Sequence, residues 1–124
     1  MKNFAIAAAT TFATCASAGA AVHASRVCVA NMGGYDLNWW IDDLITGDES
    51  NNSGSYPIDQ MRCNDIANYG LYGLAEGDFL NVMIHAVLGV TKSADTAVIF
   101  QSEPAFTVTF TCRGTTLNFE CKLN

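Results

Sequence analysis

The sequence predicts an all-β fold, an antiparallel β-sandwich of about seven strands, with a small β-barrel as the alternative. Apolar and polar residues alternate along several segments, as in strands with one face in a core. Turn-forming residues separate these segments at intervals of about ten residues. Beyond the first two dozen residues or so, no long segment carries the 3.6-residue repeat of an amphipathic helix.

The first half of the chain supplies three expected strands. Residues 27–32 are rich in β-branched side chains and end at a glycine pair, and residues 35–45 alternate strictly. The polar stretch "TGDESNNSGS" follows as a solvated loop. Residues 56–66 form the next strand, and Pro57 belongs at its start or on a sheet edge because proline lacks a backbone N–H.

The second half supplies four more strands. Residues 79–88 are the most apolar, and one face of this strand is expected in the core: Leu80, Val82, Ile84, Ala86 and Leu88. The stretch "GVTKSAD" is expected to be a turn. Residues 96–101 form a strand, and residues 106–123 form a hairpin with one apolar and one polar face.

The N-terminal residues 1–24 have the features of a signal peptide. Lys2 provides a positive charge ahead of an Ala-rich apolar stretch at residues 4–16, which is too short to span a bilayer. Cleavage is expected after Ala24, and cleavage after Ala18 or Ala20 is the alternative. We therefore expect a secreted, extracellular protein.

Residues 25–124 are expected to form a single secreted domain. Without Lys2, five cationic side chains face twelve carboxylates, a net charge of about −7. Such an acidic surface argues against nucleic acid as a partner and against electrostatic docking on anionic lipid. No second apolar run approaches the roughly 20 residues of a transmembrane helix, so no transmembrane segment is expected.

Two disulfides are predicted, because four cysteines follow the leader, which itself contains Cys15. A turn at Gly114-Thr115 would place Cys112 and Cys121 roughly 13 Å apart, whereas a disulfide tolerates about 7 Å between Cα atoms. The preferred pairing is therefore Cys28–Cys121 with Cys63–Cys112, and the alternative is Cys28–Cys112 with Cys63–Cys121. A four-cysteine zinc site is disfavoured because the spacings are wide and no Cys-x-x-Cys occurs.

A ligand-binding surface is predicted around adjacent tryptophans. Neighbouring side chains of a strand point to opposite faces, so Trp39 is assigned to the core and Trp40 to the surface. An exposed Trp40 would resemble a sugar-stacking or protein-binding platform; packing of Trp40 under a loop is the alternative. The proposed ligand-binding residues are Trp40, Asp36, Asn38, Asp42, Tyr69 and Tyr72.

The acidic loop suggests a calcium site, and no other cofactor is expected. The proposed ligands are Asp43, Asp48 and Glu49, because hard cations favour oxygen-rich loops. The stretch does not match an EF-hand loop, and a loop kept soluble by its charges is the alternative. Asn51 begins the sequence Asn-Asn-Ser, an N-glycosylation sequon on this loop if the host glycosylates exported proteins.

No catalytic constellation stands out. After the leader the chain has one histidine, His85, expected as a half-buried strand residue rather than a catalytic base. Gly-x-Ser-x-Gly is absent, and paired carboxylates are too numerous to identify a glycosidase.

The sequence therefore favours a non-catalytic extracellular binding module for a carbohydrate or protein surface. The alternative function is a membrane-active, cytolysin-like sandwich protein that perturbs neutral lipid, which rests on analogy of fold alone. A small secreted hydrolase is the third possibility.

Overall fold

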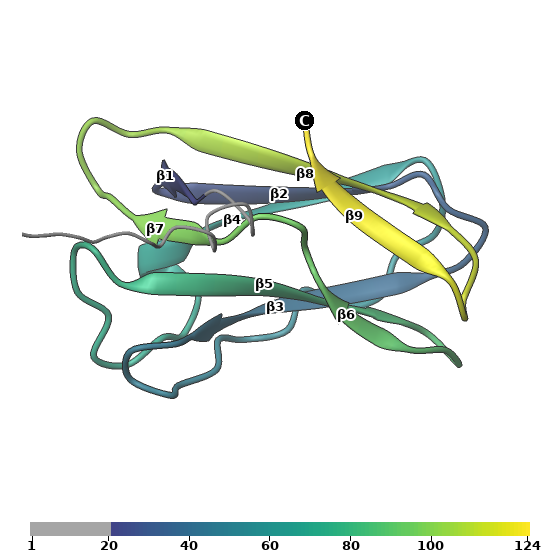
Figure 1. The fold of residues 1–124 in the computed structure, drawn as a ribbon, viewed down its shortest axis with the longest axis horizontal. Helices are drawn as coiled ribbons and strands as arrows, with labels where there is room; N and C mark the ends of the chain where they lie inside the picture. The colour runs from purple at the N-terminus through teal and green to yellow at the C-terminus, as the bar shows by residue number, and fades with distance from the viewer. Residues whose placement is uncertain (1–20) are drawn as a thin grey trace, which may run out of the picture.

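The computed structural model describes residues 21–124, which fold into two stacked sheets (Figure 1). The first sheet has the order β1 (Val22–Ala24), β7 (Val98–Phe100), β5 (Phe79–Ala86) and β3 (Leu37–Asp43), and β6 (Thr91–Ser93) also pairs with β5. The second sheet has the order β4 (Gln60–Asp65), β2 (Arg26–Asn31), β8 (Thr107–Gly114) and β9 (Phe119–Leu123). A short 3-10 helix, η3 (Ile66–Asn68), follows β4. The predicted all-β sandwich is confirmed.

Two strand pairs in this sandwich run parallel. β1 lies parallel to β7 in the first sheet, and β2 lies parallel to β8 in the second. The other paired strands are antiparallel, as expected. Among residues 21–124 no helix has the length and apolar character needed to cross a membrane.

The core lies between the sheets and follows the alternation of the strands. Along β3 every second residue is buried, and along β5 the buried residues alternate with half-buried ones after Phe79. Trp39 is fully buried, as predicted, and its ring centroid lies 5.2 Å from that of Tyr69. The largest fully buried side chains include Tyr56, Phe110, Leu37, Ile41 and Ile84.

Two short strands and one turn residue differ from the prediction. β6 lies inside the stretch expected to be a turn. Leu88, expected in the core, is 94% exposed in a left-handed conformation with φ 65°, because the strand ends at Ala86. β1 belongs to the sandwich although it precedes the expected domain start at residue 25, and Ala24 is fully buried.

The signal peptide stays a prediction, because residues 1–20 lie outside the described residues. Of the possible cleavage points, those after Ala18 and Ala20 lie ahead of β1, whereas cleavage after Ala24 would remove it.

The register of the last hairpin was predicted wrongly. Cys112 lies directly opposite Cys121, and Gly114 lies opposite Phe119. A four-residue loop therefore joins β8 to β9, closed by reciprocal backbone hydrogen bonds between Thr115 and Asn118. A shift by an even number of residues keeps every side chain on its face, so alternation alone does not separate the two registers.

The disulfide pairing was predicted wrongly for the same reason. The bonds are Cys28–Cys63 and Cys112–Cys121, with Cα–Cα distances of 4.0 and 3.9 Å. Each joins residues that face one another across an antiparallel pair of strands. The pairing of β2 with β4, which brings Cys28 to Cys63, has no local signal in the sequence.

Candidate functional site

The outer face of the first sheet carries the residues best placed to bind a ligand. Three residues of β3 point away from the core and pair with three residues of β5, as Asn38 with His85, Trp40 with Met83, and Asp42 with Asn81. All six side chains are half-buried. We call these six residues the Trp40 face.

Trp40 is held in one orientation by its neighbour on the same face. Its indole Nε1 donates a hydrogen bond of 3.1 Å to Asp42 Oδ1. The indole nitrogen is only a donor, so this bond fixes the ring relative to the strand. The predicted outward position of Trp40 holds in the structure, although the ring is partly covered rather than fully exposed.

A polar loop forms a rim beside this face. Asn52 Nδ2 donates to Asn38 Oδ1 at 2.9 Å, which fixes the orientation of the Asn38 amide. Two serine hydroxyls accept hydrogen bonds from the free edge of β3: Ser53 Oγ from the Trp39 N–H at 2.9 Å and Ser50 Oγ from the Ile41 N–H at 2.7 Å. The loop thus covers a sheet edge that would otherwise be open to pairing with another chain.

On the other side of the face, β6 supplies hydroxyl groups. His85 Nδ1 lies 2.9 Å from Thr91 Oγ1, and Ser93 pairs with Met83 across the strands. The hydrogen bond that His85 makes is therefore to a hydroxyl. Its expected place as a half-buried strand residue is confirmed.

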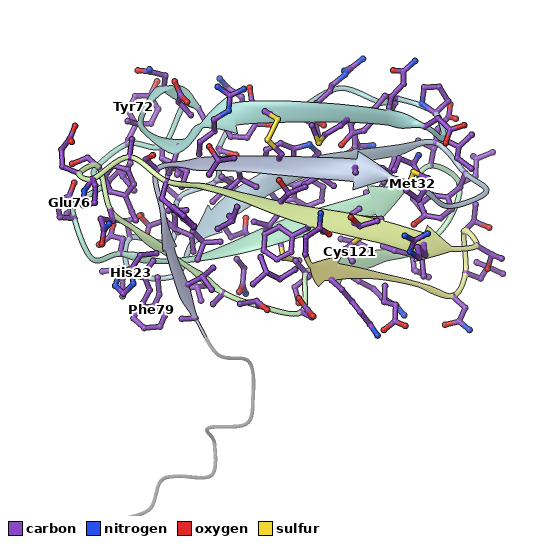
Figure 2. The ribbon with its side chains drawn as sticks, turned by 90° about the horizontal axis from the view of Figure 1, so that it is seen from above. His23, Met32, Tyr72, Glu76, Phe79 and Cys121 are labelled. Carbon is purple, nitrogen blue, oxygen red and sulfur yellow. A yellow bond between two sulfur atoms is a disulfide. The ribbon has the colours of Figure 1, made fainter. Side chains whose placement is uncertain are left out.

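The structure brings together only part of the predicted ligand site. Asn38, Trp40 and Asp42 share one face, whereas Asp36 is exposed on the turn before β3. Tyr72 is 81% exposed, and its N–H donates to Asp48 Oδ2 at 2.6 Å. Figure 2 shows Tyr72 near Glu76, at the end of the sandwich opposite Met32.

Tyr69 was assigned to the ligand surface, and this assignment is wrong. The side chain is only 4% exposed, stacks against Trp39, and donates its hydroxyl to the Trp39 carbonyl at 3.2 Å. Burial raises its pKa well above the usual value of 10.0. Tyr69 therefore supports the strand from the core side.

The three proposed calcium ligands have separate roles in the described loop. Asp43 is buried, and its Oδ1 accepts the N–H groups of Ile45 and Thr46 at 2.9 and 3.2 Å. Asp48 accepts the Tyr72 N–H, and Glu49 forms an isolated bridge with Asp42. Within residues 21–124, no three His, Cys, Asp or Glu side chains gather around a common point. Calcium binding here stays a prediction.

Asn51 is exposed at the start of its sequon, and its backbone N–H donates to the Tyr69 carbonyl at 2.7 Å. The side chain is thus reachable on an anchored stretch of the loop, and its modification stays a prediction.

Sequence reasoning did not connect Asn81, Met83 and Asn52 with Trp40. Alternation along β5 does place Asn81, Met83 and His85 on one face. The missing information was the pairing of β3 with β5, which is non-local.

No protein-family model, no curated protein and no solved structure matches this chain.

Proposed function

We propose that this chain is a non-catalytic extracellular binding module whose Trp40 face takes a carbohydrate. The main support is Trp40 itself, a partly exposed indole held by Asp42 at the centre of strand β3 on the outer face of the sheet. A sugar ring presents C–H groups on its faces and hydroxyls around its edge. An aromatic ring can contact the C–H groups while surrounding polar side chains bind the hydroxyls.

The surroundings of Trp40 suit that chemistry. The amides of Asn38 and Asn81 offer both donors and acceptors, the Asp42 carboxylate offers acceptors, and His85 offers a ring nitrogen. Because Asn52 already orients the Asn38 amide, this side chain has little conformational freedom left to lose when a ligand binds.

The same face does not favour a hydrolase. Glycoside hydrolysis needs two carboxyl groups on either side of the scissile bond. Of the six residues of the Trp40 face, only Asp42 is a carboxylate, and it is engaged by the indole of Trp40.

Secretion is part of the proposal. Two disulfides suit an oxidising compartment, where small domains use them to supplement a modest core. Together with the leader-like residues 1–24, they support an extracellular location.

A glycan array tests the proposal, with binding then quantified by titration. We expect Trp40→Ala to weaken binding at least tenfold, which is about 1.4 kcal/mol, with little change in Tm. Tyr72→Ala is the matched control, because Tyr72 is an exposed aromatic residue that is not one of the six residues of the Trp40 face. Equal losses in the two variants, or no glycan bound by the unaltered protein, would refute the proposal.

A second candidate, docking on a lipid surface, is supported by apolar turns at one end of the sandwich. Leu88 and Leu117 are 94% and 70% exposed, and their turns touch, with the Val90 N–H donating to the Thr116 carbonyl at 3.1 Å. Figure 1 shows the β5–β6 and β8–β9 turns at the same end. Exposed apolar side chains on adjoining turns are suited to insertion among lipid head groups.

Vesicle leakage and co-sedimentation with neutral phospholipid test this second function. Leu88→Gly is the informative variant, because glycine accepts the left-handed backbone of residue 88 and the fold should tolerate it. We expect lipid binding to fall severalfold in Leu88→Gly and to be unaffected by Trp40→Ala. The opposite pattern would exclude lipid docking through these turns.

A further inference from the structure

The cationic side chains of the domain are unevenly distributed. Residues 21–124 contain twelve carboxylates but only five Lys or Arg side chains, at positions 26, 62, 92, 113 and 122. Three of the five line two clefts along β8 and β9. The surface of an acidic protein is therefore locally cationic at this hairpin.

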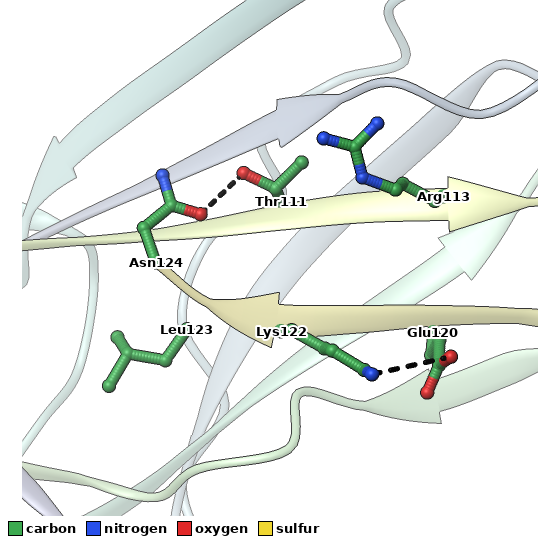
Figure 3. Close-up of a pocket in the computed structure, with 6 residues that line it drawn as sticks. All are labelled: Thr111, Arg113, Glu120, Lys122, Leu123 and Asn124. Atoms are coloured by element: carbon green, nitrogen blue, oxygen red, sulfur yellow. Dashed lines mark hydrogen bonds and ion pairs between the residues drawn. The ribbon is translucent and has the colours of Figure 1, made fainter.

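The two clefts adjoin one another. The first has a volume of about 290 Å³ and is shown in Figure 3; its lining residues are Thr111, Arg113, Glu120, Lys122, Leu123 and Asn124. The second, of about 330 Å³, is lined by Lys92 and residues of the hairpin end. Arg113 and Glu120 line both, so Arg113 shares one cleft with Lys122 and the other with Lys92.

Glu120 does not neutralise Arg113 in this arrangement. The two residues pair directly across the strands, yet the Glu120 carboxylate makes its ion pair with Lys122, at 3.7 Å. Figure 3 shows the Arg113 guanidinium turned away from Glu120. Its N–H donors are therefore not engaged by Glu120.

The other two arginines, in contrast, contact polar or aromatic groups of the protein. Arg26 lies 3.9 Å from an Asp65 carboxylate oxygen. Arg62 donates to the Ser53 carbonyl at 2.7 Å and lies over the Tyr56 ring at 4.9 Å. Among residues 21–124, Arg113 is the arginine whose guanidinium makes neither a hydrogen bond nor an ion pair.

Other polar groups leave this position open to an anion. Thr111 donates its hydroxyl to Asn124 Oδ1 at 2.6 Å, so this amide oxygen is already engaged by another residue that lines the cleft (Figure 3). The nearby Asp95 carboxylate is engaged by the Leu123 N–H at 3.0 Å and the Thr96 hydroxyl at 2.9 Å.

We propose that Arg113, which lines these clefts with Lys92 and Lys122, binds an oxyanion, the sulfate or carboxylate group of a larger ligand. The planar guanidinium presents paired N–H donors that match two oxygens of such a group. Lys92 adds positive charge in the adjoining cleft, while Lys122 stays paired with Glu120. Arg113 and Lys122 belong to the second sheet and Lys92 to β6 of the first, but none of the three is a residue of the Trp40 face, so this inference does not depend on the proposed sugar site.

Amide NMR titration with sodium sulfate, and separately with sodium acetate, tests the site at constant ionic strength held with chloride. We expect saturable shifts confined to Lys92, Arg113 and the β8–β9 turn. Arg113→Gln should weaken this binding at least tenfold, whereas Arg26→Gln, the matched loss of an exposed arginine, should leave it within twofold. Shifts spread over all five cationic residues, or equal losses in the two variants, would overturn the assignment.

The source of the anionic group is then distinguished with two probes on the intact domain. Retention of a sulfated oligosaccharide that is lost in Arg113→Gln identifies a glycan, and co-sedimentation with anionic phospholipid vesicles lost in the same variant identifies a lipid head group. Saturable sulfate binding with neither probe would show that the site takes only the free ion and would overturn the assignment to a group of a larger ligand. Trp40→Ala should leave every one of these results unchanged. Loss of binding at the Trp40 face can therefore be distinguished from loss of binding at Arg113.

Discussion

Asp43 and Asp78 hold their carboxyl groups against one another inside the fold, at the point where β3 ends and β5 begins. Both are buried, with 1% and 6% of their surface exposed. Hydrogen bonding to Asp43 is the main cause that raises the pKa of Asp78 above its usual 3.8. Asp43 Oδ2 is buried without a hydrogen-bond partner among the described residues, and a proton on Asp78 would let that carboxyl group donate to Asp43.

This pair predicts a stability that falls as the pH rises. An acid with a raised pKa in the folded state binds more protons there than in the unfolded chain. Its contribution is complete below about pH 3.8, the ordinary pKa, and is lost as the pH rises through the folded pKa. At neutral pH the pair is expected to destabilise the fold.

Asp78→Asn should therefore raise Tm at pH 7. The asparagine Oδ1 can still accept the Ala75 N–H, which Asp78 Oδ2 accepts at 3.1 Å, and its amide can donate to Asp43. Asp36→Asn, at an exposed position, serves as the control and should change Tm little. Thermal melts from pH 3 to 8 measure this, and a lower Tm of Asp78→Asn at pH 7 would contradict it.

Two buried tyrosines should respond oppositely to loss of the hydroxyl. Tyr56 donates to the Val29 carbonyl at 2.6 Å, so Tyr56→Phe should cost about 1–2 kcal/mol of unfolding free energy. The Tyr35 hydroxyl is buried without a partner among the described residues, and burial raises its pKa to about 12. Tyr35→Phe should be neutral or should stabilise by up to about 1 kcal/mol. Urea titration compares them, and equal losses would contradict the prediction.

Removing either disulfide should lower the free energy of unfolding by a few kcal/mol. The disulfide that closes the longer loop should restrict the entropy of the unfolded chain more. Cys28 and Cys63 are 35 residues apart, and Cys112 and Cys121 are 9 apart. Loop-closure entropy gives about 3.8 and 2.7 kcal/mol respectively for the two double alanine variants. Packing lost around the buried Cys112 and Cys121 adds to the second value. Non-reducing peptide mapping checks the pairing directly, and a Cys28–Cys121 peptide would contradict it.

The contact between the β5–β6 and β8–β9 turns depends on a glycine. A Cβ at residue 89 would lie 2.2 Å from the Thr116 carbonyl oxygen. Gly89→Ala should therefore cost about 1–3 kcal/mol, because backbone must move. Gly34→Ala is the matched control, since its nearest atom would lie 4.0 Å away. Equal stability of the two variants in urea would show that the turns do not need this close approach.

The parts of the fold that could be predicted are those with a local signal. Alternation along one strand placed Trp39 inside and Trp40 outside, and gathered Asn38, Trp40 and Asp42 on one face. The same alternation could not choose between registers of the last hairpin, because both keep Cys112 and Cys121 on the core side. The disulfide error followed from that ambiguity.

The rest depends on contacts between distant segments. Tyr69 lies in a glycine-rich stretch with no periodicity, so its stacking on Trp39 had no sequence signal. His85 and Met83 join the Trp40 face only through the pairing of β3 with β5. Arg113 likewise has no ion pair with Glu120 because Glu120 pairs with Lys122 instead, and only the side-chain geometry reveals which of these two neighbours Glu120 contacts.

The parallel pairing of β1 with β7 and of β2 with β8 constrains the order in which this protein can fold during synthesis. Val22 pairs with Val98, and Arg26 pairs with Thr107, so β1 and β2 have partners that emerge from the ribosome many residues after them. Neither sheet can be completed before β7 and β8 are made, and such long-range contacts slow folding. The nascent polypeptide should therefore remain open and accessible to chaperones until β7 and β8 have been synthesised.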